Sequence, residues 1–206
     1  MTDAERPQIY LVTPPEFDLE TFPDILAAVL DSTEIACLRM ALSTQDTDQI
    51  MRSGDVLRDI VHARDIPLVI QSHVAMVERL GLDGVHLTDG ARSVRQVRKD
   101  LGGDAIIGAF CGTSRHDGMS AGEAGADYIS FGPVGATGLD GGEVVDIDVF
   151  QWWSEVVEVP VVAEGSLDEE NLATISKITD FIGLGPEIWT DNEPAARLIS
   201  LTTSLN

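Results

Sequence analysis

The sequence predicts a closed (β/α)₈ barrel (a TIM barrel) formed by a single domain over residues 1–206, with a doubly wound open sheet as the competing topology. Apolar, strand-like runs alternate with amphipathic helical segments along the chain. The runs are near-continuously apolar, which is typical of parallel strands covered by helices. A turn, an aspartate, an apolar run and an exit loop recur at Gly81–Thr88, Gly125–Pro133 and Thr179–Pro186. This recurrence indicates repeated βα units.

The strand-like segments are short, mainly apolar and bounded by turn-forming residues. They follow one another at a spacing that leaves room for a helix between each pair. In chain order, the predicted strands are Gln8–Thr13, Ile35–Leu42, Pro67–Ile70, Gly84–Leu87, Ala105–Phe110, Asp127–Gly132, Pro160–Ala163 and Phe181–Leu184.

The predicted helices carry apolar residues at helical spacing, and two of them also have start signals. Ser114 followed by Asp117 forms a capping pair, and Asp168 precedes an acidic first turn. The predicted helices are Leu19–Leu30, Thr47–Ala63, Val74–Leu80, Val94–Leu101, Arg115–Ala124, Ile147–Val156, Glu169–Ile178 and Glu193–Leu201.

The composition excludes several classes of partner. Acidic residues number 35 against 13 basic ones, for a formal net charge of −22, so we expect no nucleic acid and no anionic membrane as partners. No apolar run is long enough to cross a bilayer, and Cys37 and Cys111 lie far apart in the sequence. We therefore predict a cytoplasmic protein. Neither Lys99 nor Lys177 ends a predicted strand, which disfavours a Schiff-base aldolase.

In a barrel of this kind, the residues that follow the strands meet at one rim, where function resides. Backbone N–H groups at the ends of strands seven and eight form a candidate phosphate cradle. Its residues would be Gly165, Ser166, Gly183 and Gly185. The alternative is that these glycines only permit tight turns. Glu164 and Glu187 weigh against phosphate, because a carboxylate repels it.

Side chains at the same rim are candidates for chemistry. Arg115 is a candidate anion contact, and His116, at a helix start that favours the neutral imidazole, is a candidate acid or base. The alternative for both is an ordinary surface pair. Asp89 is a candidate Mg²⁺ ligand beside a diphosphate, whereas the mid-strand His86 is expected to be a bonded core histidine.

Two further segments leave alternatives open. The glycine-rich stretch 135–142 is either a lid over the mouth or a flexible connection. Trp152 and Trp153 mark an oligomer contact if they are exposed, and core packing if they are not.

Several segments together resemble the thiamine phosphate synthase family, which includes thiazole tautomerases. The most specific is Gly125–Val134, and weaker matches follow in order across nearly the whole chain. They are Tyr10–Thr13, Leu38–Arg39, Leu82–Leu87, Ile107–Gly108, Val159–Ala163 and Glu170–Asn171.

The resemblance implies a (β/α)₈ barrel and a role in thiamine biosynthesis. The family's synthase joins hydroxymethylpyrimidine diphosphate to thiazole phosphate and releases diphosphate with Mg²⁺, so the resemblance implies small phosphorylated heterocycles as ligands. The family's Gln-x-Arg-x-Lys motif stands here as Cys37, Arg39 and Ala41. Its Asn-Asp pair stands as Gln71 and Ser72. We therefore predict Arg39 as an anion contact, and Gln71 and Ser72 as further contacts to the substrate or its phosphate.

Other positions of the family pattern are also replaced. The loop lysine falls at about Asp140, the second metal-binding aspartate near Ala91, and the tautomerase histidine near Gly112. The sequence thus predicts a synthase-like protein with altered catalytic residues. The alternatives are a non-catalytic member that binds a ligand or a partner, a tautomerase-like isomerase, or another phosphosugar enzyme on the same barrel.

Overall fold

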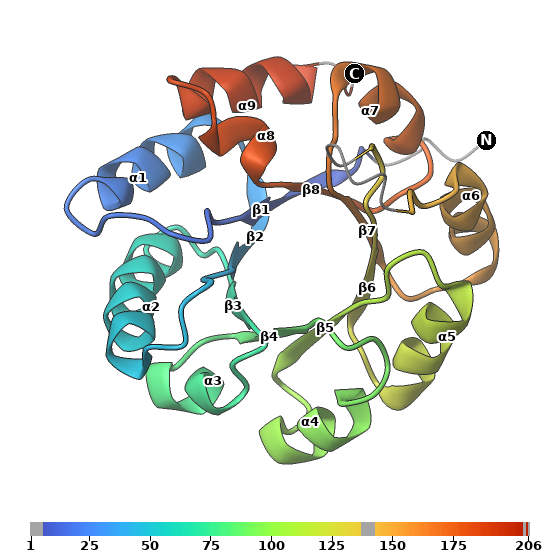
Figure 1. Cartoon of the computed structure of the whole chain (residues 1–206), viewed down its shortest axis with the longest axis horizontal. Coiled ribbons are helices and arrows are strands. Elements are labelled where there is room, and N and C mark those ends of the chain that lie inside the picture. Colours follow the sequence, from blue (N-terminus) through green and yellow to red (C-terminus); the bar gives the residue numbers. More distant parts are fainter. Residues whose placement is uncertain (1–5, 137–142, 204, 206) are drawn as a thin grey trace.

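In a computed structural model of the chain, eight parallel strands close into a barrel in sequence order, and the helices form a ring around it (Figure 1). The structure describes residues 6–136, 143–203 and 205. The first strand pairs with both the second and the eighth, and every adjacent pair is parallel. The predicted (β/α)₈ barrel is therefore confirmed, and the open sheet is excluded.

The strands lie where the apolar runs predict them, within two residues at each end. Each is four to six residues long, because a parallel barrel of this size needs only short strands to cross its wall. They are β1 (Gln8–Val12), β2 (Ile35–Met40), β3 (Leu68–Gln71), β4 (Gly84–Leu87), β5 (Ile106–Phe110), β6 (Tyr128–Phe131), β7 (Val161–Glu164) and β8 (Phe181–Leu184).

The helices also follow the sequence pattern, and the predicted caps are present. The Ser114 hydroxyl accepts a hydrogen bond from the Asp117 N–H, and Asp168 and Asn171 form a capping box. The short α8 directly follows β8. The helices are α1 (Phe22–Ser32), α2 (Thr47–His62), α3 (Ala75–Leu80), α4 (Val94–Leu101), α5 (Arg115–Ala124), α6 (Ile147–Val156), α7 (Glu169–Ile175), α8 (Pro186–Trp189) and α9 (Pro194–Thr203).

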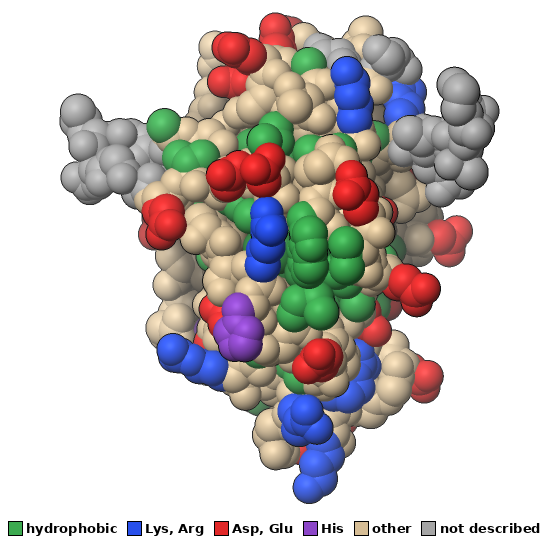
Figure 2. Space-filling model, turned by 90° about the vertical axis from the view of Figure 1, so that its right-hand side faces the viewer, with side chains coloured by type: hydrophobic (Ala, Val, Ile, Leu, Met, Phe, Trp, Pro, Cys, Tyr) green, Lys and Arg blue, Asp and Glu red, His purple; other side chains and the backbone are tan. Residues whose placement is uncertain are grey.

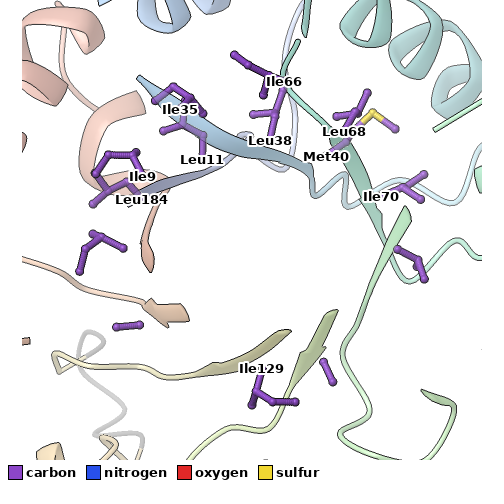
Figure 3. Close-up of a cluster of buried hydrophobic side chains, with 14 of the residues drawn as sticks. Ile9, Leu11, Ile35, Leu38, Met40, Ile66, Leu68, Ile70, Ile129 and Leu184 are labelled. Atoms are coloured by element: carbon purple, nitrogen blue, oxygen red, sulfur yellow. The ribbon is translucent and has the colours of Figure 1, made fainter. Parts of the chain in front are cut away.

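Two hydrophobic layers hold this arrangement together. The larger layer lies between the strands and the helices, where side chains such as Leu11, Leu38 and Ile70 point outward from the barrel wall (Figure 3). A smaller cluster consists of Tyr10, Cys37, Val69, Tyr128 and Val162. Its members alternate along the strands with outward-facing residues, so this cluster fills the inside of the barrel.

The recurring aspartates of the sequence pattern have a structural role at the amino ends of the strands. The carboxylates of Asp83, Asp127 and Asp180 accept hydrogen bonds of 2.7, 2.7 and 2.8 Å from backbone N–H groups in β3, β5 and β7. Each aspartate immediately precedes the next strand, which is β4, β6 or β8. The pattern therefore ties neighbouring strands together at the end of the barrel opposite the candidate site.

Acidic residues outnumber basic ones, 35 to 13. Figure 2 shows one side of the molecule, where both acidic and basic side chains lie around a central hydrophobic patch. Trp153 is buried in the core and Trp152 is half-buried, so core packing accounts for the first of these tryptophans. Within the described residues, no helix is both long and apolar enough to span a membrane.

We expect Asp180→Ala to lower the free energy of unfolding by about 1–3 kcal/mol, because the Val161 N–H would lose its acceptor in a partly buried position. Urea denaturation measures this change. Asp104→Ala, at an exposed position before β5, is the matched control and should change stability by less than about 0.5 kcal/mol. Equal effects of the two substitutions would contradict the tying role of Asp180.

Candidate functional site

A pocket of about 740 Å³ opens at the carboxyl ends of the strands. Its position follows from the parallel barrel, which brings the end of every strand to one rim. Six of the residues predicted for ligand binding line it, namely Arg39, Gln71, Gly165, Ser166, Gly183 and Gly185. The other lining residues are Val12, His86, Thr88, Phe110, Gly132, Pro133, Glu164, Pro186 and Glu187.

The floor of the pocket is a buried ion pair that spans the barrel interior. Arg39 comes from β2 and Glu164 from β7, and two guanidinium nitrogens donate to the two carboxylate oxygens, one of them at 3.3 Å. Ser130 of β6 donates a third hydrogen bond, at 2.7 Å, to Glu164 Oε1. Both charged side chains are about nine-tenths buried. The pair is therefore held in a fixed bidentate geometry.

A chain of hydrogen bonds continues from Arg39 across the barrel. Arg39 Nη1 lies 2.6 Å from His86 Nε2, and His86 Nδ1 lies 2.9 Å from the Tyr128 hydroxyl. Because arginine only donates, Nε2 must accept, so Nδ1 carries the proton of the neutral imidazole and donates to Tyr128. The Tyr128 hydroxyl in turn lies 2.6 Å from that of Tyr10. Gly108 makes this chain possible, since a Cβ there would fall 2.0 Å from the Tyr128 ring.

Burial and charge fix the protonation states of this network. Burial raises the pKa of the Glu164 carboxyl, but the charge of Arg39 and the hydrogen bonds from Arg39 and Ser130 outweigh it and lower the pKa to about 2. Burial and then the Arg39 charge hold the pKa of His86 well below its ordinary value. At neutral pH the network therefore contains one positive charge, one negative charge and a neutral imidazole.

The ion pair determines whether the charge of Arg39 is available to bind a ligand. The charge of Arg39 is compensated inside the protein, so it is not free to hold an anion. Its Nε atom is buried and has no hydrogen-bond partner among the described residues. A buried donor of this kind is normally satisfied. Because Nε is itself buried, it is not exposed to a ligand in the pocket.

One wall of the pocket is formed by the loops that follow β7 and β8. Gly165 and Ser166 both have positive φ angles, of 89° and 55°, which turn the chain sharply after β7. The side chain of Glu187 reaches into this corner. It accepts hydrogen bonds from the N–H groups of Gly185, at 2.8 Å, and Leu167, at 3.2 Å.

Four predicted site residues are not brought to the pocket. Ser72 is exposed and bonds to Thr88, and His116 is exposed on α5. Arg115 lies 5.3 Å from the Trp152 ring and donates a hydrogen bond of 2.7 Å to the Asp148 carbonyl. None of these residues lines the pocket. The catalytic roles of Arg115 and His116 stay predictions from the sequence, without support from the pocket geometry.

The fourth, Asp89, was predicted as a Mg²⁺ ligand. Its Oδ2 accepts a hydrogen bond of 2.5 Å from Ser93, and Asp89 does not line the pocket. Among the described residues, no group of three or more His, Cys, Asp or Glu side chains is arranged to hold a metal ion. The surroundings of Asp89 therefore do not fit a built Mg²⁺ site.

The predicted lid lies mainly at residues 137–142, outside the described part of the chain. Gly135, at the start of this segment, is packed against the loop after β7. A Cβ at Gly135 would fall 2.2 Å from the Ser166 carbonyl oxygen. Its role as a lid stays a prediction.

Comparison with known proteins decides the family. The family model "Thiamine monophosphate synthase" matches residues 9–181, from β1 to the first residue of β8. The chain belongs to the thiamine monophosphate synthase family. It is 38% identical to the thiamine-phosphate synthase of Rhodospirillum centenum, over 95% of this chain and 93% of that relative. It is 28% identical to the thiamine-phosphate synthase of Haloarcula marismortui, over 96% of each chain.

A solved structure shares the family fold. The thiamine phosphate pyrophosphorylase from Pyrococcus furiosus superposes with a TM-score of 0.82, at 20% sequence identity and over 96% of each chain. At this level of identity the likeness shows the fold alone. The family model and the relatives, by contrast, confirm the family resemblance drawn from Gly125–Val134 and the weaker segments.

The sequence analysis did not predict all the residues that line the pocket of this member of the thiamine monophosphate synthase family. It assigned His86 to the core, which is correct for burial, but it did not place His86 in the pocket lining or link it to Arg39 and Tyr128. A usable signal exists: Arg39, His86, Ser130 and Glu164 are polar residues within otherwise apolar strands. In a barrel, such residues are expected to point inward and to pair.

We expect Glu164→Gln to lower the free energy of unfolding by about 3–5 kcal/mol, because it leaves the buried Arg39 charge without its counterion. Chemical denaturation at pH 7 measures the change. Glu158→Gln, an exposed position, is the matched control and should cost less than about 0.5 kcal/mol. A loss of less than about 1 kcal/mol for Glu164→Gln would contradict the proposed importance of the pair.

The same pair predicts a pH dependence. Because the pKa of Glu164 is lowered from the ordinary 4.5 to about 2, its contribution to stability is full above pH 4.5 and is lost as the pH falls through 2. The difference in unfolding free energy between wild type and Glu164→Gln should therefore shrink across this range. Denaturation curves at several pH values between 2 and 6 measure it. A difference that stays constant would show that Glu164 does not titrate as described.

Proposed function

We propose that this chain is a thiamine phosphate synthase-like protein whose mouth pocket binds a small heterocycle of thiamine biosynthesis, a thiazole or a pyrimidine. One observation carries the proposal: a pocket of about 740 Å³ lies at the functional end of a barrel that belongs to this family. The volume suits a small heterocycle.

The chemistry of the lining supports a heterocycle. Val12, Phe110 and Pro133 provide apolar contact area for a planar ring. Arg39 and His86 contribute polar groups at the floor of the pocket. Thr88, Gln71 and Ser166 add neutral polar groups around the ring.

The first candidate activity is the synthase reaction, in which hydroxymethylpyrimidine diphosphate is joined to thiazole phosphate. Relatives that bear the name thiamine-phosphate synthase, up to 38% identical over nearly the full length, support it. The phosphorylated form of the ligands, the Mg²⁺ requirement and the cytoplasmic location stay predictions from the sequence.

The second candidate is binding without turnover, and the charges of the pocket favour it. A synthase must stabilise the charge of departing diphosphate, which calls for free cations or a metal. The described lining contains one arginine, already paired to Glu164, and no lysine. Formation of thiamine phosphate from both substrates with Mg²⁺ would support the first candidate, and ligand binding without product would support the second.

We expect isothermal titration calorimetry to detect binding of hydroxyethylthiazole, of its phosphate or of both to the wild-type protein. Thr88→Phe should abolish that heat, because Thr88 is exposed at the rim and a ring there would fill the pocket mouth. Thr47→Phe, exposed at the start of α2, is the control and should bind like wild type. Absence of heat for both ligands at millimolar concentration, or unchanged binding by Thr88→Phe, would contradict the pocket assignment.

A further inference from the structure

Phe110 is the last residue of β5, and it lines the pocket. Its direction follows from its position, because alternate residues of a strand face the same side. A Cβ at Gly108 would meet the Tyr128 ring at 2.0 Å, and Ile106 packs against the inner cluster that contains Tyr128. Ile106 and Gly108 thus face the barrel interior, and Phe110, two residues beyond Gly108, faces the same way.

The strand register places Phe110 at the level of the polar floor. Phe110 pairs with Ser130 of β6, and the Ser130 hydroxyl donates to Glu164 of the buried ion pair at 2.7 Å. Deeper in the barrel, Tyr10 and Tyr128 fill the interior. A ligand that rests on the floor of the pocket therefore lies beside the Phe110 ring.

The hydrophobic core does not take up this side chain. Phe110 is half-buried and belongs to neither of the two hydrophobic clusters. Within the described part of the chain, its ring contacts no other aromatic ring. By contrast, Phe131 on β6 is fully buried and contacts the rings of Phe150 and Trp153. The partly exposed ring of Phe110 leaves apolar area for a ligand to cover.

The other planar groups of the pocket lining are already engaged. Among the lining residues, His86 has the only other aromatic ring. It is 1% exposed and stacks on Tyr128, with the ring centroids 5.7 Å apart. The planar guanidinium of Arg39 is about nine-tenths buried and paired with Glu164. Phe110 is therefore the aromatic surface that the described lining presents to a ligand.

We propose that Phe110 is a specificity-determining residue: the heterocycle stacks on its exposed ring face, and this contact gives the pocket its preference for a planar aromatic ligand. Two stacked aromatic rings stabilise each other beyond the apolar area that they bury. Nitrogen-containing rings gain in the same way, as nucleobases do on aromatic side chains. The inference rests on the proposed function. It applies to the thiazole with or without its phosphate, because both forms contain the stacked ring.

A filling role for Phe110 is the competing explanation. In that case, the side chain only closes the top of the barrel interior and narrows the pocket. Replacement by a side chain without a ring would then lower stability, while ligand affinity would stay the same or increase. The two explanations therefore differ in the affinity for the heterocycle and in the surroundings of its bound ring.

Isothermal titration calorimetry compares hydroxyethylthiazole and its phosphate on wild type, Phe110→Leu and Phe110→Tyr. Phe110→Leu keeps an apolar side chain but removes the aromatic face, so both ligands should bind about three- to tenfold more weakly. Phe110→Tyr keeps the ring and should stay within about twofold of wild type. Phe17→Leu is the control: it removes a half-buried ring that stacks on Phe22, outside the pocket lining, and should bind like wild type.

Proton NMR supplies a signature that a filling role would not produce. An aromatic ring current shields protons that lie over its face. The ring protons of hydroxyethylthiazole at saturation should therefore shift upfield with wild type, Phe110→Tyr and Phe17→Leu, and this shift should be lost with Phe110→Leu. Thermal unfolding shows whether each variant is folded. If Phe110→Leu does not fold, Phe110→Met takes its place, because methionine adapts to irregular gaps and has no ring.

The outcomes separate the stacking role from the proposed function. Weaker binding of both ligands by Phe110→Leu, together with loss of the upfield shift, would support the stacking role. If wild type binds but Phe110→Leu binds as tightly or more tightly, or if the shift persists in Phe110→Leu, the stacking role is overturned while the proposed function stands. If neither ligand binds wild type, the proposed function fails and the stacking role fails with it.

Discussion

The buried ion pair between Arg39 and Glu164 is the constraint on which the candidate site depends. It joins β2 to β7 across the inside of the barrel, where two charges persist only because each satisfies the other. The pair aligns the guanidinium so that it also reaches His86, and through it Tyr128. It thereby sets the protonation states, the polarity and the shape of the pocket floor together.

The two ends of the barrel have different roles: the amino ends of the strands stabilise the fold, and the carboxyl ends form the pocket. At the amino ends, Asp83, Asp127 and Asp180 tie pairs of strands together through backbone N–H groups. At the carboxyl ends, glycines leave the pocket open and let the chain turn sharply. Loops at the carboxyl ends can therefore vary without disturbing the ties that hold the strands, which suits a fold used for many reactions.

The charges of the mouth are set by a few side chains. One guanidinium is paired internally, and the corner opposite the floor is occupied by the carboxylate of Glu187 rather than left open. Both features follow from single side chains placed on a conserved architecture of strands and loops, which the Pyrococcus furiosus structure shares at 20% identity. Fold and family thus set where a ligand would lie.

The sequence by itself determined the strands, the helices, the caps at Ser114 and Asp168, and the ring of glycines at the mouth. These features follow from local patterns, because apolar runs, capping residues and turn residues act on neighbours in the chain. Arg39, Gly165 and Gly185, which the sequence predicted for the rim, line the pocket. Only the tertiary structure decided the partners of the polar groups.

Arg39 and Glu164 are 125 residues apart, and nothing local to either selects the other. Arg115 was expected at the mouth because it begins α5, yet its side chain turns toward Trp152 and the Asp148 carbonyl on α6. The direction of a long side chain is set by the nearest partner in space, and closing the barrel is what brings such partners together.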